Sequence, residues 1–195
     1  MIKGILITFF VLVLVGCSTN QLDAPYGFKW GQTPADVKRL NLVGLQCTEF
    51  QENGALCSTP NTPTVKGRMF LLMFSREENT LMLISAQGKD SRDQAVILAE
   101  YDEINQKMYE KYGIPKKTIE RYKRDSFFLD KISDDETTPF KRVYEQNGMQ
   151  IMVGIVSNSH FKKIHNKKDI IYSVMIIYNL IPDKPQEMTT KNEIE

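Results

Sequence analysis

Apolar residues recur along this chain in two spacings, and each spacing predicts a type of secondary structure. In the segment 91–113 they fall one, three or four residues apart, which is typical of one face of a helix. That face consists of Ile97, Leu98, Tyr101, Ile104, Met108 and Tyr112. Gly113, followed by Ile114-Pro115, is expected to end the helix. The pattern therefore predicts one long helix in the middle of the chain.

Nearly continuous apolar runs on both sides of this helix predict strands. Before it, residues 68–75 and 80–87 flank the polar residues 76–79 and are expected to form an antiparallel hairpin. After it come four strand-like runs, at 126–132, 140–146, 149–157 and 169–181. Asn147-Gly148 favours a tight hairpin turn between the second and third of these runs.

A second, shorter helix is predicted near the start of the folded part. Thr33 fits an N-cap, Pro34 fits the first helical position, and the Asp36 carboxylate can reach back to free amides. We expect this helix to end at about Leu40, and residues 59–67 to form a loop. The order of elements indicates an α+β fold, with an antiparallel sheet packed by one long helix and a short N-terminal helix.

The first residues of the chain follow a different pattern. Lys3 precedes an apolar run from Gly4 to Val15, as in an export signal. The run has about a dozen residues, fewer than the roughly 20 that a membrane-spanning helix needs. It ends in Leu14-Val15-Gly16-Cys17, which resembles the lipobox of bacterial lipoproteins. That resemblance implies cleavage before Cys17 and acylation of this cysteine. Because Ser18 stands where some bacteria use aspartate to retain lipoproteins at the inner membrane, it also implies the outer membrane.

The other two cysteines, Cys47 and Cys57, lie in an expected extended pair at 41–58. An exported protein meets an oxidising compartment, which favours a disulfide between them. A two-residue turn at Asn53-Gly54 would keep them from facing each other, because odd positions would then oppose even ones. A loop of odd length centred near Glu52, or a bulge, would bring them together. We expect the disulfide and not the tight turn.

The expected organisation is a signal peptide at 1–16, a lipidated tether at 17–27, one domain at 28–181 and a disordered tail at 182–195. The whole chain has 25 Lys and Arg against 24 Asp and Glu, and Lys3 lies in the signal peptide. The mature chain therefore has no net charge. Nucleic-acid binding normally needs a basic excess on one face, so we expect no nucleic-acid partner.

One segment nevertheless concentrates positive charge. In 116–126 basic residues alternate with an aromatic one and with polar residues. This segment is the candidate partner-binding site, and it comprises Lys116, Lys117, Arg121, Tyr122, Lys123 and Arg124. It would suit an acidic partner or anionic headgroups. The alternative is a solvated connection between two elements.

Residue patterns for catalysis are weak. The two histidines, His160 and His165, lie in a lysine-rich loop without a set of metal ligands nearby. Carboxylate pairs suited to glycan hydrolysis are Glu77-Glu78, Asp134-Asp135-Glu136, and Glu100 with Glu103. All are expected at the surface, whereas a general acid needs a sheltered carboxyl group. We therefore expect no catalytic residue, no cofactor and no metal.

A further resemblance concerns the start of the domain. Trp30-Gly31-Gln32-Thr33 with Val37 and Leu40, followed by two strands, is similar to small outer-membrane assembly lipoproteins of the SmpA/BamE type. The similarity covers about a third of the chain. It departs at Leu42-Val43-Gly44-Leu45, where those proteins tend to have a Gly-x-Pro turn, and in the second set of strands. It implies fold and location, and we transfer no functional residue from it.

These observations favour a non-catalytic lipoprotein that is anchored to the outer membrane, faces the periplasm and binds another protein. Three alternatives stay open from the sequence. The chain would also suit an immunity lipoprotein that neutralises a periplasmic toxin, an envelope hydrolase or a lipid carrier.

Overall fold

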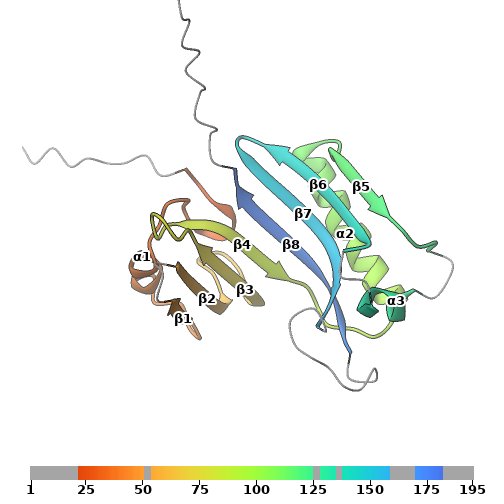
Figure 1. Ribbon diagram of the computed structural model, residues 1–195, viewed down its shortest axis with the longest axis horizontal. Helices are drawn as coiled ribbons and strands as arrows, with labels where there is room; N and C mark the ends of the chain where they lie inside the picture. Colours follow the sequence, from red (N-terminus) through yellow and green to blue (C-terminus); the bar gives the residue numbers. More distant parts are fainter. Residues whose placement is uncertain (1–21, 51–53, 125–127, 135–137, 159–169, 182–195) are drawn as a thin grey trace, which may run out of the picture.

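Eight strands form one antiparallel sheet in a computed structural model, which describes residues 22–50, 54–124, 128–134, 138–158 and 170–181. The strand order is β1-β2-β3-β4-β8-β7-β6-β5 (Figure 1). The strands are β1 (Gln46–Phe50), β2 (Gly54–Asn61), β3 (Lys66–Phe74), β4 (Leu81–Gln87), β5 (Lys117–Glu120), β6 (Phe140–Gln146), β7 (Met149–Ser157) and β8 (Tyr172–Leu180). The helices are η1 (Pro25–Gly27), α1 (Pro34–Arg39), α2 (Gln94–Tyr112) and α3 (Leu129–Asp134).

The predicted short helix α1 is confirmed, together with its cap. The Asp36 amide donates to Thr33 Oγ1 at 3.2 Å, and the Thr33 amide donates to Asp36 Oδ2 at 2.9 Å. These two bonds make a capping box, and Pro34 occupies the first turn. Val37 is fully buried, so α1 is fixed to the core by its apolar side.

One face of the sheet is covered by two different parts of the chain. The long helix α2 lies against β6, β7 and β8. Residues 22–45 lie against the other half of the sheet, which includes β3 and β4. The centre of the Tyr26 ring is 4.9 Å from that of Phe70 in β3, and the Gly31 amide donates to the Leu81 carbonyl in β4. The α+β fold on an antiparallel sheet is confirmed, and the expectation that one long helix packs this sheet is corrected, because the helix covers only part of it. The helix is too short to cover eight strands, and the N-terminal segment, with Trp30 buried, covers the rest.

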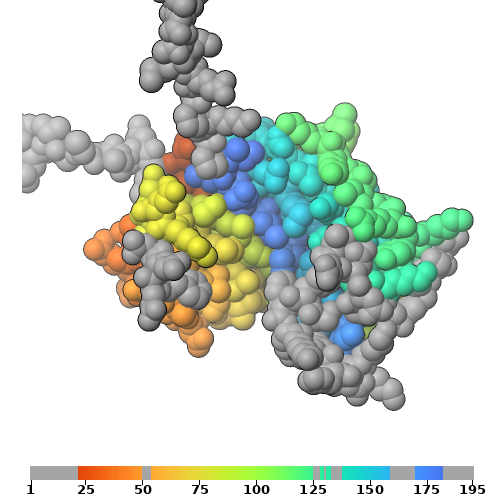
Figure 2. Space-filling view, in the orientation of Figure 1, coloured from red at the N-terminus to blue at the C-terminus, as the bar shows by residue number. Residues whose placement is uncertain are grey.

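The opposite face of the sheet has no helix over it in the described part of the chain. Side chains alternate along β3, where Phe70 and Leu72 are fully buried while Met69 and Met73 are each 46% exposed. In Figure 1 α2 lies behind β6–β8, and Figure 2 looks onto the opposite side, where β3, β4, β8 and β7 reach the surface. We call this side the open face.

Three sequence predictions need correction. The run 126–132, predicted as a strand, contains the start of helix α3, and its Phe128, Leu129 and Ile132 side chains are fully buried. These three positions have the spacing of a helix face, which packs them together on one side. Residues 117–120, expected in a connection, form the edge strand β5. The expected loop at 59–67 is shorter, because β2 continues to Asn61 and β3 begins at Lys66.

The hairpin predictions can be checked residue by residue. Cys47 lies directly opposite Cys57 and is bonded to it, with an S–S distance of 2.04 Å. Gly54 pairs with Phe50, so the connection is centred on residue 52 and the two-residue turn at 53–54 does not form, as expected. Between β6 and β7, Asn147 and Gly148 have φ angles of 51° and 70°, which the predicted tight turn requires.

The described chain begins to contact the sheet before residue 28. Asp23 and Lys29 form an isolated bridge, and Ala24 is 9% exposed. Cys17, the two histidines and the expected tail at 182–195 lie outside the described residues. Among the described residues, no helix has both the length and the apolar character needed to cross a bilayer.

Candidate functional site

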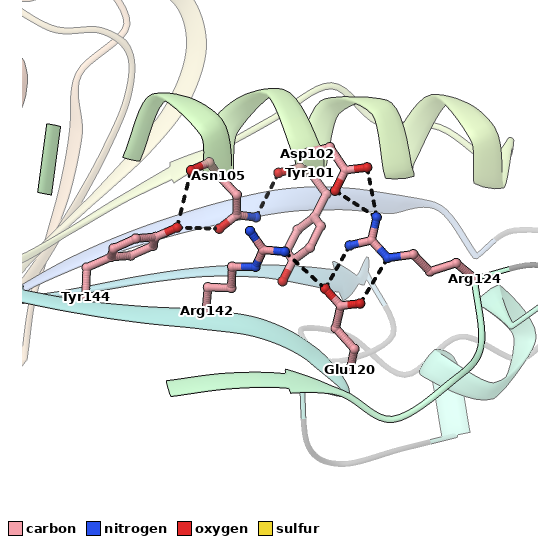
Figure 3. A network of polar contacts seen from close by, with 7 residues as sticks. All are labelled: Tyr101, Asp102, Asn105, Glu120, Arg124, Arg142 and Tyr144. Atoms are coloured by element: carbon pink, nitrogen blue, oxygen red, sulfur yellow. Dashed lines mark hydrogen bonds and ion pairs between the residues drawn. The ribbon is translucent and has the colours of Figure 1, made fainter. Parts of the chain in front are cut away.

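The predicted basic segment lies on β5 and on the chain that follows it, beside the C-terminal half of α2 (Figure 3). Lys116 precedes the strand, and its ammonium group forms an ion pair with Glu145 of β6. Lys117 is the first residue of β5 and is exposed. Arg124 lies beyond the strand and turns back toward α2. The segment is thus folded onto neighbouring acidic groups at both of its ends.

Arg124 is bound by two carboxylates from different elements. Its Nη1 is 2.8 Å from both Asp102 carboxylate oxygens, on α2. Its Nη2 and Nε are 2.7 and 3.0 Å from the two Glu120 oxygens, at the end of β5. Both contacts are charge-assisted, and the one to Glu120 is bidentate. These bonds hold the pKa of Glu120 below its ordinary value, first through the hydrogen bond from Arg124. Arg124 therefore connects the edge strand to the helix.

A second guanidinium group completes this cluster. Arg142 Nη2 of β6 is 3.4 Å from the Glu120 carboxylate. The guanidinium carbons of Arg124 and Arg142 each lie 5.9 Å from the centre of the Tyr101 ring. Both guanidinium groups can therefore interact with the Tyr101 ring, and both contact the Glu120 carboxylate. We call Tyr101, Asp102, Glu120, Arg124 and Arg142 the arginine cluster.

Two atoms of the arginine cluster are buried without a hydrogen-bond partner in the described structure. They are the Tyr101 hydroxyl oxygen and Arg142 Nε. Tyr101 is fully buried, and burial is the main reason that its pKa is raised well above the ordinary value. Its hydroxyl group therefore stays protonated at physiological pH, so it is unsuited to act as a base there.

The helix also carries a polar residue that the sequence analysis missed. Asn105 is fully buried; its Nδ2 donates to the Tyr101 carbonyl at 2.8 Å, and its Oδ1 accepts from the Tyr144 hydroxyl at 3.1 Å. Figure 3 shows this contact next to the arginine cluster. The signal in the sequence was an asparagine on the apolar stripe, directly after Ile104. These bonds link α2 to β6 and satisfy a buried amide.

The remaining basic-segment residues differ in their surroundings. Tyr122 is partly buried, and its ring is stacked 6.3 Å from that of Phe128. Lys131 approaches the same ring, with Nζ 5.6 Å from its centre. Arg121 and Lys123 are exposed. The aromatic residue of the segment therefore packs beside α3, and Lys117, Arg121 and Lys123 are exposed residues.

Of the carboxylates considered for hydrolysis, Asp135 and Glu136 lie outside the described residues, and Glu100 and Glu103 have different partners. Glu100 accepts from the Lys89 amide at 3.3 and 3.2 Å and lies 3.6 Å from Arg68 Nη2. Glu103 pairs instead with Lys107 at 2.5 Å, and this hydrogen bond is the main reason that its pKa is lowered. A general acid needs the opposite shift. Within the described ranges, no three His, Cys, Asp or Glu side chains gather as a metal site would require.

The open face offers a different kind of surface. Register places Met73 of β3 between Leu56 of β2 and Leu83 of β4, and in the next row Leu71 pairs with Ser85, which pairs with Ile177 of β8. A cavity of about 280 Å³ opens on this face. It is lined by Leu71, Gln87, Asp90, Asn158, Ile171, Ser173 and Met175. Leu56, Met73 and Leu83 thus form an apolar row across three strands, and in the next row Leu71 and Ile177 lie on either side of the buried Ser85.

Methionine is frequent on the open face. Met69 and Met73 of β3, Met152 of β7 and Met175 of β8 all point to this side, judged by the alternation of side chains along each strand. Met175 is 7% exposed and lines the cavity, whereas Met69 and Met73 are the most exposed of the four. Methionine side chains are flexible and polarizable, and they are common on surfaces that adapt to a partner.

The chain matches no protein-family model, no curated protein and no solved structure.

Proposed function

We propose that this chain is a lipid-anchored, periplasm-facing envelope protein that binds another protein and does not catalyse a reaction. The observation that carries the proposal is the open face, an apolar and methionine-rich sheet surface with no helix over it in the described structure. Exposed apolar surface is costly in water, and large patches of it mark interaction sites. The lipobox supplies the location, because acyl chains on Cys17 would hold the domain at a membrane.

On the open face, the size of the cavity suits an anchoring side chain of a protein partner better than a free small molecule. Pockets for small ligands usually enclose about 300–1,000 Å³, and this one is near the lower limit. Leu71, Ile171 and Met175 in its lining would accept one apolar side chain, while Gln87 and Asp90 supply polar groups. Buried anchor residues of this type commonly dominate the affinity of an interface.

The arginine cluster supports the proposal in a second way. Because Arg124 and Lys116 are paired with acidic neighbours, these two residues stabilise the fold around β5. A contribution of the segment to partner binding would come through long-range attraction by its positive charges, which mainly increases the association rate.

The test compares two substitutions of equal exposure on opposite sides of the molecule. Met73 on the open face is 46% exposed and Val96 on α2 is 47% exposed. Each is changed to glutamate in the tagged full-length lipoprotein, and the partner recovered with the wild-type protein from envelope extracts is quantified. We expect Met73→Glu to lower its recovery at least about tenfold, since a charge would be buried in the interface, and Val96→Glu to leave it unchanged.

The outcomes separate the proposed function from its alternatives. Equal recovery with both variants, at unchanged thermal stability, would contradict binding through the open face. A stoichiometric partner that proves to be a toxin would identify the immunity function. Co-purifying lipid in place of protein, or hydrolysis of envelope glycan by the purified protein, would refute the proposed function outright.

A further inference from the structure

Exposed apolar residues gather at one end of the sheet. Leu22 is 65% exposed, Ile114 80% and Ile181 38%, and Tyr109 in the last turn of α2 is 51% exposed. In Figure 1 the start of the described chain, the end of β8 and the connection from α2 to β5 all lie along the upper edge. We call these four residues the apical group.

Hydrogen bonds place Leu22 and Ile181 at this same end. The Trp30 amide donates to the Leu22 carbonyl at 2.9 Å, and the next amide, that of Gly31, donates to Leu81 at the start of β4. Since β4 and β8 are antiparallel, the start of β4 lies beside the end of β8. There the Ile181 amide donates to the Gly148 carbonyl at 2.7 Å.

The connection after α2 reaches the same end of the sheet. Ile114 follows the C-cap of α2, and two residues later Lys116 pairs with Glu145. Glu145 lies opposite Gln150 in the β6–β7 hairpin. The turn of this hairpin, at 147–148, includes the Gly148 carbonyl that accepts from the Ile181 amide. The apical group therefore comes from three separate parts of the chain that meet at one end of the domain.

The lipid attachment site is close to the apical group along the chain. Leu22 is the fifth residue after Cys17, and a chain of five residue steps spans at most about 18 Å when fully extended. An acylated Cys17 lies at the surface of the bilayer, so Leu22 must lie within that distance of it. No other end of the domain is constrained in this way.

We propose that the apical group rests on the lipid bilayer, with Leu22, Ile114 and Ile181 in the headgroup region; this inference rests on the proposed lipid anchor. Isolated apolar side chains are stabilised at this depth, and tyrosine is enriched there because its ring is apolar and its hydroxyl group is polar. The strands of the sheet then run away from the membrane. The open face stands to the side, where a periplasmic protein can reach it.

The experiment measures the depth of single probes in the acylated protein. The full-length lipoprotein is reconstituted in vesicles of phosphatidylethanolamine and phosphatidylglycerol that contain headgroup-spin-labelled lipid. A fluorescent thiol probe is attached to Ile114→Cys or Ile181→Cys. The introduced thiol is the reactive one, because Cys47 and Cys57 form a disulfide and Cys17 is acylated.

Matched control sites lie at the opposite end. Val43 is 78% exposed, and its carbonyl accepts from the side chain of Asn61, at the end of β2. Val96 is 47% exposed in the first turn of α2, just after the Ser91 bridge to the start of β8. These exposures are close to those of Ile114 and Ile181, so differences in quenching report position relative to the bilayer.

We expect the spin label to quench probes at 114 and 181 at least about twice as strongly as probes at 43 and 96. Equal quenching at all four sites, or stronger quenching at 43 and 96, overturns the inference. Metabolic labelling with a radioactive fatty acid is measured in the same preparations. Acylated protein with unquenched probes overturns the orientation alone, whereas protein without acyl label overturns the anchor and the orientation together.

Discussion

Glu120 is the residue on which the arginine cluster depends most directly. Its carboxylate binds Arg124 through two hydrogen bonds and Arg142 through one contact at 3.4 Å. Changing it to glutamine keeps the shape of the side chain and removes its charge. The two guanidinium groups would then remain on either side of Tyr101 with one fewer counter-charge, and the new amide nitrogen would face a donor. We expect Glu120→Gln to destabilise the protein.

The size of the effect follows from exposure. The Glu120 side chain is 26% exposed, and those of Arg124 and Arg142 are 34% and 29% exposed. Exposed ion pairs contribute about 0.2–1 kcal/mol each, and hydrogen bonds to charged groups about 1.5–3 kcal/mol when buried. For a half-buried cluster we expect a loss of about 1–2 kcal/mol in the free energy of unfolding.

The effect should depend on pH. The pKa of Glu120 is lowered in the folded state from its ordinary value of 4.5. A carboxyl group with a lowered pKa stabilises the fold above its ordinary pKa, and this contribution disappears as the pH falls through the folded-state pKa. The difference between wild type and Glu120→Gln should be constant from pH 7 to about pH 5, and it should shrink at lower pH.

Urea denaturation of the unlipidated chain from Ser18 onward measures this difference. Trp30, the only tryptophan, is 5% exposed and reports unfolding by its fluorescence. Glu103→Gln is the control, because it removes the same charge from an exposed pair on α2. If Glu120→Gln destabilises no more than Glu103→Gln, or if its effect is the same at pH 3 as at pH 7, the account of the cluster is wrong.

Three further predictions concern other parts of the chain. Cys17→Ala should abolish fatty-acid labelling and release the protein from membranes, and a variant that still fractionates as a lipoprotein would refute the lipobox interpretation. Replacing both Cys47 and Cys57 by alanine should lower the urea-derived free energy of unfolding by about 3 kcal/mol, because a loop spanning ten residues is no longer closed in the unfolded chain. Gly148→Ala should cost about 1 kcal/mol in the same assay, since its φ of 70° is unfavourable for a residue with a Cβ; an unchanged midpoint would contradict this.

The elements that could be predicted from the sequence are those with strong local signals. Helix α1 follows from the capping residues around Thr33, and α2 follows from its apolar stripe. The connection of odd length between β1 and β2 follows from the requirement that Cys47 and Cys57 face each other. In each case a few neighbouring residues determine the geometry, so tertiary contacts are not needed to infer it.

Elements whose structure depends on distant contacts were missed. Helix α3 contains a short apolar run, and such a run does not distinguish a strand from a buried helix. Strand β5 is mostly polar, because it is an edge strand with exposed Lys117 and Thr118. Its pairing with β6 is a tertiary contact. The arginine cluster was missed for the same reason: Asp102, which neutralises Arg124, lies 22 residues away in sequence.

The place of β8 in the sheet has a consequence for biogenesis. This strand is the last of the eight in sequence, yet it lies between β4 and β7 and is the element through which the two halves of the sheet are joined. A nascent chain therefore cannot close the sheet until residue 180 has been synthesised. Up to that moment β4 and β7 each lack the neighbour that β8 provides. Premature stop codons a few residues before the end of β8 should consequently abolish the folded protein, whereas loss of residues 182–195 should keep the eight described strands.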